Sequence, residues 1–164
     1  MLLCAMDPGL KGGVVVIQGN RLIEANALPL GVKGSGAIDV CQLFELIKMA
    51  DHAVIEIPIP VAVNSGGSLA TSFTNYGRML AAIEIRQIPY TVLQPNMIRK
   101  TMGARANASK KEWGKDQTAE WVFKQRPDWL FASIKKGKRH DGILDACAIG
   151  LVYQMLTGER RVSP

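Results

Sequence analysis

Apolar runs with the pattern of β-strands open the chain. Residues 2–6, 13–17 and 21–28 are short and either apolar throughout or alternate apolar with polar positions, as in strands that pack on a core. Between the second and third run, Gln18-Gly19-Asn20 is a signal for a tight hairpin. The start of the sequence therefore predicts three consecutive strands, the last two joined by a short turn.

Beyond residue 37 the apolar positions recur mostly every three to four residues, which is the period of a helix. This spacing predicts helices over residues 38–50, 68–86, 96–102 and 141–157, and a further helix over 110–125 with Ser109 as its N-cap. Two more strands are expected around Glu56 and over 90–93. The order predicts an α/β fold with a mixed five-stranded sheet flanked by helices, as one domain over residues 1–164.

Length and composition indicate how large a core the chain can build and in which compartment it is expected. With 164 residues and 48% hydrophobic content, the chain can build a full core. No signal peptide is apparent, and no apolar stretch approaches the ~20 residues of a membrane span. The three cysteines are far apart and lie in apolar elements, as small core residues of a reducing compartment do. We therefore expect a cytoplasmic protein with no membrane partner, and an organellar origin stays open.

Four acidic residues stand where a charge is costly. Asp7 ends the first apolar run, Glu56 lies within a second one, and Asp141 and Asp145 begin the apolar segment of the last helix. A spacing of four residues puts the last two on one helix face, about 6 Å apart along the axis. Two strands and one helix would thus bring four carboxylates together. Such a cluster repels itself unless divalent cations neutralise it, and Mg²⁺ prefers carboxylate oxygens.

Each acid also has a simpler interpretation. Asp7 precedes Pro8-Gly9 and can form a turn, and Asp141 can be the N-cap or first-turn acid of the last helix. A buried salt bridge can account for either Glu56 or Asp145, which otherwise lie among apolar residues. Since none of these alternatives covers all four positions, the set together favours a metal site.

Positive charge is concentrated in one part of the chain. Residues 97–140 hold 12 Lys or Arg against four acids, a net charge of +8, whereas the other residues carry a net charge of −2. This basic segment leads into Asp141, so it could bind the phosphodiester backbone of a nucleic acid next to the metal ligands. The alternative is a solvated loop that only aids solubility. The candidate DNA-binding residues are Arg99, Lys100, Lys110, Lys111, Lys115, Lys135, Lys136, Lys138 and Arg139.

Several motifs in order along the chain resemble RuvC-type Holliday junction resolvases, the crossover junction endodeoxyribonucleases. They are Met6-Asp7-Pro8-Gly9, Ile55-Glu56, Tyr76-Gly77-Arg78, residues 94–101, Ser109-Lys110-Lys111 with Lys115, and Asp145 with the apolar residues after it. The resemblance implies a ribonuclease H-like fold and a homodimer that cuts four-way DNA junctions by paired nicks. It further implies two Mg²⁺ ions per site, for which Mn²⁺ would substitute, and 5′-phosphate and 3′-hydroxyl product ends.

The chain also departs from the bacterial pattern. Its last two acids are four residues apart where bacterial members usually have three, and His140 precedes them. These differences indicate a divergent, phage-like or organelle-like branch and leave the cleavage-sequence preference open. Asp7, Glu56, Asp141 and Asp145 are the expected metal ligands and catalytic residues. His140 is either a weaker ligand and proton carrier or a partner of a DNA phosphate.

Other functions remain to be weighed against this one. A nuclease for forks or flaps would need the same acids and the same basic segment. A junction-binding module without nuclease activity would keep the basic segment and lose acids, yet all four are present. A phosphotransferase of the actin and sugar-kinase type shares the topology but needs two such domains, and this chain has the length of one.

Overall fold

The computed structural model describes residues 1–31, 36–59, 66–104, 114–129, 134–135 and 138–158. A five-stranded sheet forms its centre, with the strands β1 (Leu2–Asp7), β2 (Gly13–Gln18), β3 (Arg21–Ala27), β4 (His52–Glu56) and β5 (Tyr90–Leu93). The strand order is β3-β2-β1-β4-β5. The β1–β2 and β2–β3 pairs are antiparallel, whereas β4 runs parallel to both β1 and β5. The predicted mixed five-stranded sheet is therefore confirmed.

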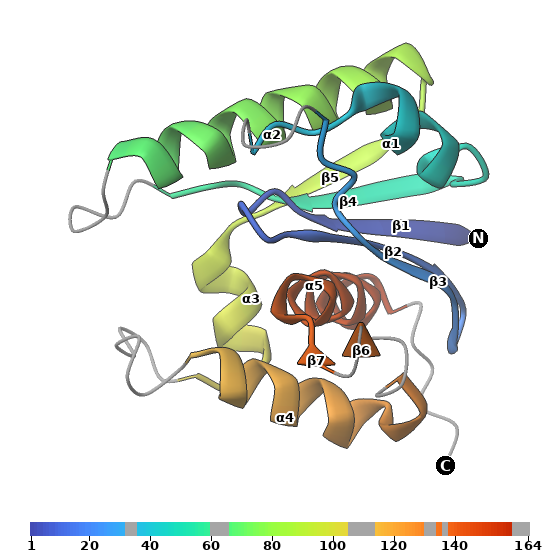
Figure 1. The fold of residues 1–164 in the computed structure, drawn as a ribbon. Helices are drawn as coiled ribbons and strands as arrows, with labels where there is room; N and C mark the ends of the chain where they lie inside the picture. Colours follow the sequence, from blue (N-terminus) through green and yellow to red (C-terminus); the bar gives the residue numbers. More distant parts are fainter. Residues whose placement is uncertain (32–35, 60–65, 105–113, 130–133, 136–137, 159–164) are drawn as a thin grey trace.

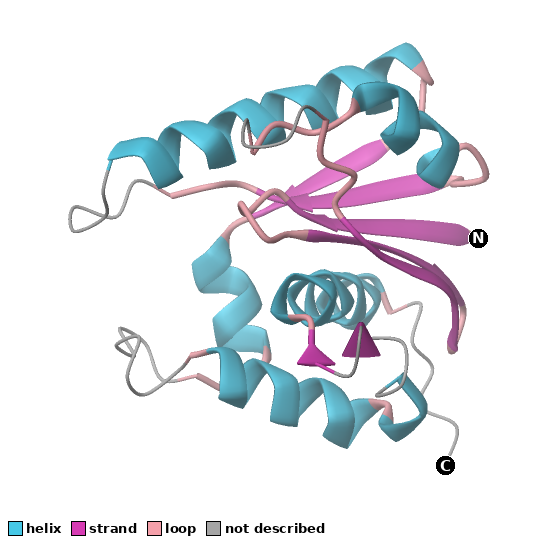
Figure 2. Cartoon of the chain, in the orientation of Figure 1, coloured by secondary structure: helices cyan, strands magenta, loops and turns pink. Residues whose placement is uncertain are grey.

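Helices cover both faces of this sheet (Figures 1 and 2). On one face lie α1 (Val40–Ile47) and α2 (Gly66–Ile85), and on the other lies α5 (Asp141–Thr157). Below α5 in Figure 1, α4 (Lys115–Gln125) forms an outer layer, and α3 (Pro95–Thr101) connects β5 to this side of the molecule. The described segment before α5 also holds the 3₁₀ turn η1 (Pro127–Trp129) and a hairpin of β6 (Ile134–Lys135) and β7 (Lys138–Arg139).

In the segment before α5, one prediction was wrong and one element was missed. The helix predicted from residue 110 begins at Lys115, and its N-cap is Gly114 and not Ser109, which lies outside the described residues. The Gln117 side chain accepts a hydrogen bond from the Gly114 N–H at 2.9 Å. This bond satisfies a backbone N–H at the start of the helix, where such groups have no partner within the helix. The β6–β7 hairpin was not predicted, because it consists of two short strands without an apolar alternation.

The core has one apolar cluster on each side of the sheet, and α5 dominates one of them. This helix is buried along most of its length, between the sheet and α4. Gly150 permits the close packing, since a Cβ there would lie 2.5 Å from Cδ1 of Ile17. Cys4 and Cys147 are buried and unbonded as expected, whereas Cys41 is exposed, contrary to the expectation for all three. No helix in the described part of the chain is long and apolar enough to span a membrane.

The start of α5 is pressed against the loop between β1 and β2. Gly12 and Gly142 form an isolated parallel bridge, and a Cβ on Gly142 would overlap the Lys11 carbonyl. A Cβ on Gly13 would similarly lie 2.5 Å from the Gly142 carbonyl oxygen. Only glycine allows backbones to come this near. The contact holds the first turns of α5 beside the end of β1, where Asp7 lies.

Candidate active site

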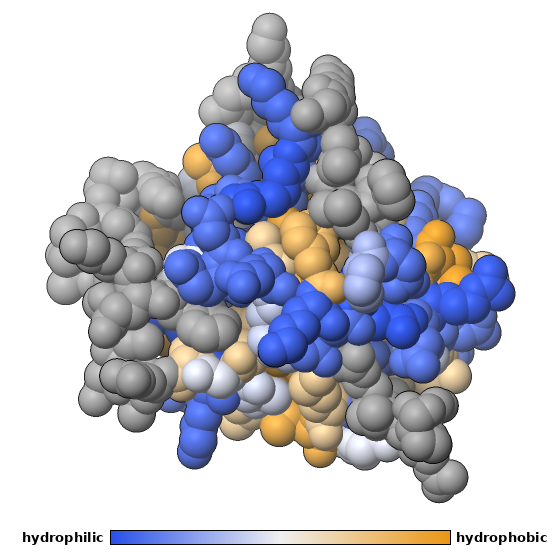
Figure 3. Space-filling view, turned by 90° about the horizontal axis from the view of Figure 1, so that it is seen from below, coloured by the Kyte–Doolittle hydropathy of each residue, from blue (hydrophilic) through white to orange (hydrophobic). Residues whose placement is uncertain are grey.

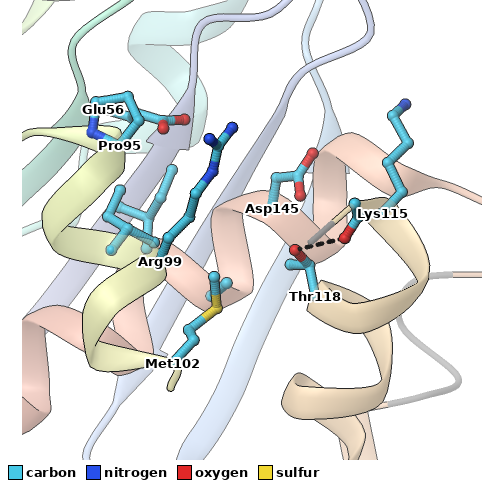
Figure 4. Close-up of a pocket in the computed structure, with 11 residues that line it drawn as sticks. Glu56, Pro95, Arg99, Met102, Lys115, Thr118 and Asp145 are labelled. Atoms are coloured by element: carbon cyan, nitrogen blue, oxygen red, sulfur yellow. Dashed lines mark hydrogen bonds between the residues drawn. The ribbon is translucent and has the colours of Figure 1, made fainter. Parts of the chain in front are cut away.

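Three of the four predicted acids meet where two strands end against a helix. Asp7 is the last residue of β1, and Glu56 is the last residue of the neighbouring parallel strand β4. Asp145 lies one turn into α5 and lines a pocket of about 440 Å³ with Glu56 and a second pocket of about 350 Å³ with Asp7. Figure 4 shows Asp145 and Glu56 on opposite sides of the first pocket. We call Asp7, Glu56 and Asp145 the inner acids.

The turn after β1 shows that Asp7 has a structural role as well. Its Oδ1 accepts a hydrogen bond from the Gly9 N–H at 2.9 Å, and the Gly12 N–H donates to the Gly9 carbonyl at 2.9 Å. An Asp that bonds the backbone two residues on is a usual turn former. The simpler interpretation of Asp7 is thus correct, and it is compatible with a site role because Asp7 still lines the pocket with Asp145.

The inner acids share an environment that disfavours negative charge. The residues are partly exposed, but protein atoms surround their carboxyl groups. Burial raises the pKa of Asp7 to about 6, against the Gly9 hydrogen bond and Lys115, which lower it. Burial, Asp7 and Asp145 raise the pKa of Glu56 to about 8, with Arg99 opposing them. Burial and Asp7 likewise raise the pKa of Asp145 to about 7. Three carboxyl groups that repel one another are therefore set at one place.

The fourth acid, Asp141, has a different environment. Its Oδ2 accepts from Lys115 Nζ at 3.0 Å, and its Oδ1 accepts from Arg139 Nε at 2.9 Å. Arg139 also donates from its other end to Asp116 at 2.7 Å. Partial burial acts to raise the pKa of Asp141, but the hydrogen bonds from Lys115 and Arg139 outweigh it and the pKa is lowered. Lys115, Asp116, Arg139 and Asp141 are called the outer ion-pair network.

The donor chemistry of the inner acids fits a hard divalent cation. Mg²⁺ is held in proteins by one or a few carboxylates together with water and substrate phosphate oxygens. Among the residues that the structure describes, no three His, Cys, Asp or Glu side chains form a ready metal-binding group. The assignment of metal ligands therefore stays a prediction.

His140 has a role in the structure that sequence reasoning missed. It is the N-cap of α5, and its Nδ1 accepts a hydrogen bond from the Ile143 N–H at 3.3 Å. The residue pattern gave no signal for this, since histidine is not among the usual N-cap residues. Asp141, for which an N-cap or first-turn role was considered, is the first residue of the helix.

The predicted DNA-binding residues divide into three groups. Arg99 and Lys115 line the first pocket together with Glu56 and Asp145, and Lys115 lines the second pocket too. Lys100, Lys138 and Arg139 lie exposed on α3 and β7, and Lys135 is in β6. Lys110, Lys111 and Lys136 lie outside the described residues. Figure 3, seen from below the view of Figure 1, shows hydrophilic residues across much of the described surface.

Comparisons with known proteins agree with this arrangement at the level of the fold. No protein-family model and no curated protein matches the sequence. Two solved structures match over 97% of the chain: T. thermophilus RuvC in complex with a Holliday junction substrate, with a TM-score of 0.65 at 15% identity, and Thermus thermophilus RuvC, with a TM-score of 0.63 at 16% identity. The chain covers 97% and 98% of them respectively. The protein therefore has the RuvC fold, which is ribonuclease H-like.

Proposed function

We propose that this protein is a RuvC-type, metal-dependent endonuclease that cuts four-way DNA junctions, with a single nuclease domain over residues 1–164. The observation that carries the proposal is the group of three mutually repelling inner acids together with basic side chains. Glu56 and Asp145 share one pocket with Arg99 and Lys115, and Asp7 and Asp145 share the second pocket with Lys115. Carboxylates that repel one another bind cations, and basic side chains bind a polyanion. Divalent ions held by the acids and a scissile phosphate bound by the basic side chains would satisfy both requirements.

In this proposal the inner acids hold two Mg²⁺ ions, or Mn²⁺ in their place. Ions bound there would supply Lewis-acid stabilisation for hydrolysis that leaves 5′-phosphate and 3′-hydroxyl ends. Asp7, Glu56 and Asp145 provide the ligand oxygens. Asp141 adds its carboxylate when Lys115 and Arg139, which hold it at 3.0 and 2.9 Å, turn to DNA phosphates. His140, one residue before, keeps the start of α5 in place.

The basic residues bind the arms of the junction. Arg99 and Lys115 act nearest the cut, and the remaining contacts fix position along the backbone without reading bases. These outer contacts come from Lys100, Lys110, Lys111, Lys135, Lys136, Lys138 and Arg139. The similarity in fold to T. thermophilus RuvC, which was solved in complex with a Holliday junction substrate, supports branched DNA as the partner. A cytoplasmic location is part of the proposal.

A cleavage assay with Mg²⁺ tests this function. The substrates are a four-way junction, a Y-fork, a flap and a linear duplex of matched sequence, and the proteins are the wild type and Asp145→Asn. We expect the wild type to cut the junction preferentially and Asp145→Asn to bind it without cutting. Preferential cutting of forks or flaps would instead assign the protein to other branched DNA. Binding without cutting by the wild type would make it a junction-binding module.

Two cuts on one junction require two inner-acid sites, and we propose a homodimer as their source. A four-way junction has two-fold symmetry, and one described chain supplies one set of inner acids. The protein should sediment as a dimer, and a plasmid with an extruded cruciform should become linear within one binding event. A monomer that leaves only nicked circles would contradict the paired cuts.

A further inference from the structure

The pocket beside the inner acids is larger and more apolar than ions and a phosphate require. It has a volume of about 440 Å³ and lies between α3, α4 and α5. In Figure 4 the charged groups of Glu56, Arg99, Asp145 and Lys115 gather towards one end, while Met102 lies at the other. The rest of the lining is mostly apolar: Pro95, Ile98, Ala148 and Ile149. The site thus has a charged end and an apolar end.

The apolar end does not suit a metal ion or a phosphate group of the DNA backbone. Metal ions and phosphate groups interact with polar and charged atoms, and neither gains from contact with Ile98 or Met102. Pockets of about 300–1,000 Å³ with apolar walls and a few polar groups are typical of sites for small organic groups. The volume and the lining together therefore indicate an organic ligand that is attached to a phosphate.

In DNA the flat, partly apolar group next to each phosphate is the base. We propose that this pocket receives one unpaired nucleobase of the strand being cut, while the neighbouring phosphate lies at the inner acids. The inference deepens the proposed function and rests on it. Two features support this occupant: Asp145 lines the pocket and also belongs to the inner acids, and Arg99 and Lys115, whose charges suit a phosphate, line the same pocket.

This placement gives a physical source for selectivity between DNA structures. Removing a base from its stack costs free energy, and the cost is lowest where pairing is already broken. Packing the base against the apolar lining returns part of this cost, because apolar surface of the base and of the pocket leaves water. The balance is favourable at a branch point and unfavourable in a continuous duplex. A protein that reads no base edges can then still prefer a junction.

The direct test uses 2-aminopurine, a fluorescent base that brightens when it leaves the stack. It is placed in turn at each position around the cleavage site of a four-way junction, and the wild-type protein is added with Ca²⁺ to prevent cutting. We expect the fluorescence to rise severalfold at one position next to the cut, and to stay low there in a linear duplex.

Two matched variants on the α3 segment show whether the pocket holds that base. Met102→Trp fills the apolar end, and Met97→Trp adds the same side chain at an exposed position outside the pocket lining. We expect Met102→Trp to lose the rise in fluorescence and to lower the junction-over-duplex preference about tenfold, which corresponds to ~1.4 kcal/mol. Met97→Trp should behave as the wild type. A Mg²⁺-dependent rise in melting temperature checks that the inner acids remain intact in both.

The outcomes separate this inference from the proposed function. If the wild type cuts junctions but no position brightens, the pocket proposal is overturned and the nuclease stands. The same holds if Met102→Trp brightens the base as much as the wild type does, because the base is then unstacked elsewhere. If Met102→Trp does not fold, Met102→Phe takes its place, and an unchanged rise in fluorescence in that variant likewise overturns the pocket proposal. Absence of junction cutting would overturn the proposed function itself.

Discussion

The inner acids and the outer ion-pair network lie side by side but have opposite electrostatic characters. Asp145 and Asp141 occupy successive turns of α5, yet the pKa of Asp145 is raised to about 7 while that of Asp141 is lowered. Burial and the neighbouring Asp7 act on Asp145, whereas Lys115 and Arg139 hydrogen-bond Asp141. The inner acids thus store repulsion that a cation can relieve, and the outer network is already neutralised. Removing a charge should therefore have different effects in the two regions.

The largest difference should appear in cleavage. Glu56→Gln, Asp7→Asn or Asp145→Asn removes a charge that has no cation partner at hydrogen-bonding distance among the described residues, and thereby weakens divalent ion binding. Mutation of a group that only supports a metal ligand typically lowers metal affinity or activity about 10–100-fold. Loss of a ligand itself should therefore reduce junction cutting by at least about a hundredfold. Junction binding measured by gel shift should persist. Near-normal cutting by any variant would remove that residue from the site.

The second largest difference between the inner acids and the outer ion-pair network should appear in the pH dependence of stability. Glu56 has an ordinary pKa of 4.5 and a pKa of about 8 in the folded protein, so between these values the folded state binds more protons than the unfolded state. The free energy of unfolding therefore falls as pH rises from 4.5 to 8 and then levels off. We expect the metal-free melting temperature to fall by roughly 5 °C from pH 5 to pH 8.

Mg²⁺ and Glu56→Gln provide the controls for that experiment. Mg²⁺ at pH 8 should restore much of the lost melting temperature, because a cation stabilises the charged inner acids. Glu56→Gln should make the metal-free curve flatter, since the group that titrates with the largest shift is gone. A melting temperature that rises with pH in the metal-free wild type would show that the inner acids do not repel one another.

Lys115 connects the two regions, and its removal should affect ligands of opposite charge in opposite ways. It bonds Asp141 at 3.0 Å and lowers the pKa of Asp7 and Asp145. Lys115→Met should raise Mg²⁺ affinity severalfold in calorimetric titration, since a competing cation is lost. It should also weaken DNA binding and lower the slope of log affinity against log salt by about 0.9.

Lys48→Met is the matched control for that variant. Lys48 caps α1 and pairs with Glu45 at 3.0 Å, on the other face of the sheet from α5. It should leave both Mg²⁺ affinity and the salt slope unchanged. Equal effects of the two variants would indicate a general loss of charge and would remove Lys115 from the site.

The smallest effect is expected at the rim of the outer network. The Asp116 side chain is 81% exposed and pairs with Arg139. Exposed ion pairs contribute about 0–1 kcal/mol, so Asp116→Asn should change the free energy of unfolding in urea by less than about 1 kcal/mol. Cutting should persist, and DNA binding should tighten slightly because Arg139 has one partner fewer. A large loss of stability would mean that the outer network is a structural requirement.

The fold and the group of acids were predicted from different features of the sequence. The strands and helices follow from apolar periodicity, and the β1–β4 edge with Asp7 and Glu56 follows from where two apolar runs end. The start of α4 was missed because Gly114 and Gln117 form its cap with weak sequence signals. The apolar end of the pocket was missed because its residues come from separate helices, each of which reads as ordinary core.

The sequence by itself determined the α/β element order and marked the acids, since periodicity and the cost of a charge among apolar residues are local properties. Tertiary structure decided which acid is paired. Lys115 and Asp141 are 26 positions apart, and the Gly12–Gly142 contact sets where α5 begins relative to β1. Coulombic energy and desolvation depend on distance and surroundings, not on residue type. Two aspartates four residues apart on one helix therefore acquire opposite pKa shifts only when the chain is folded.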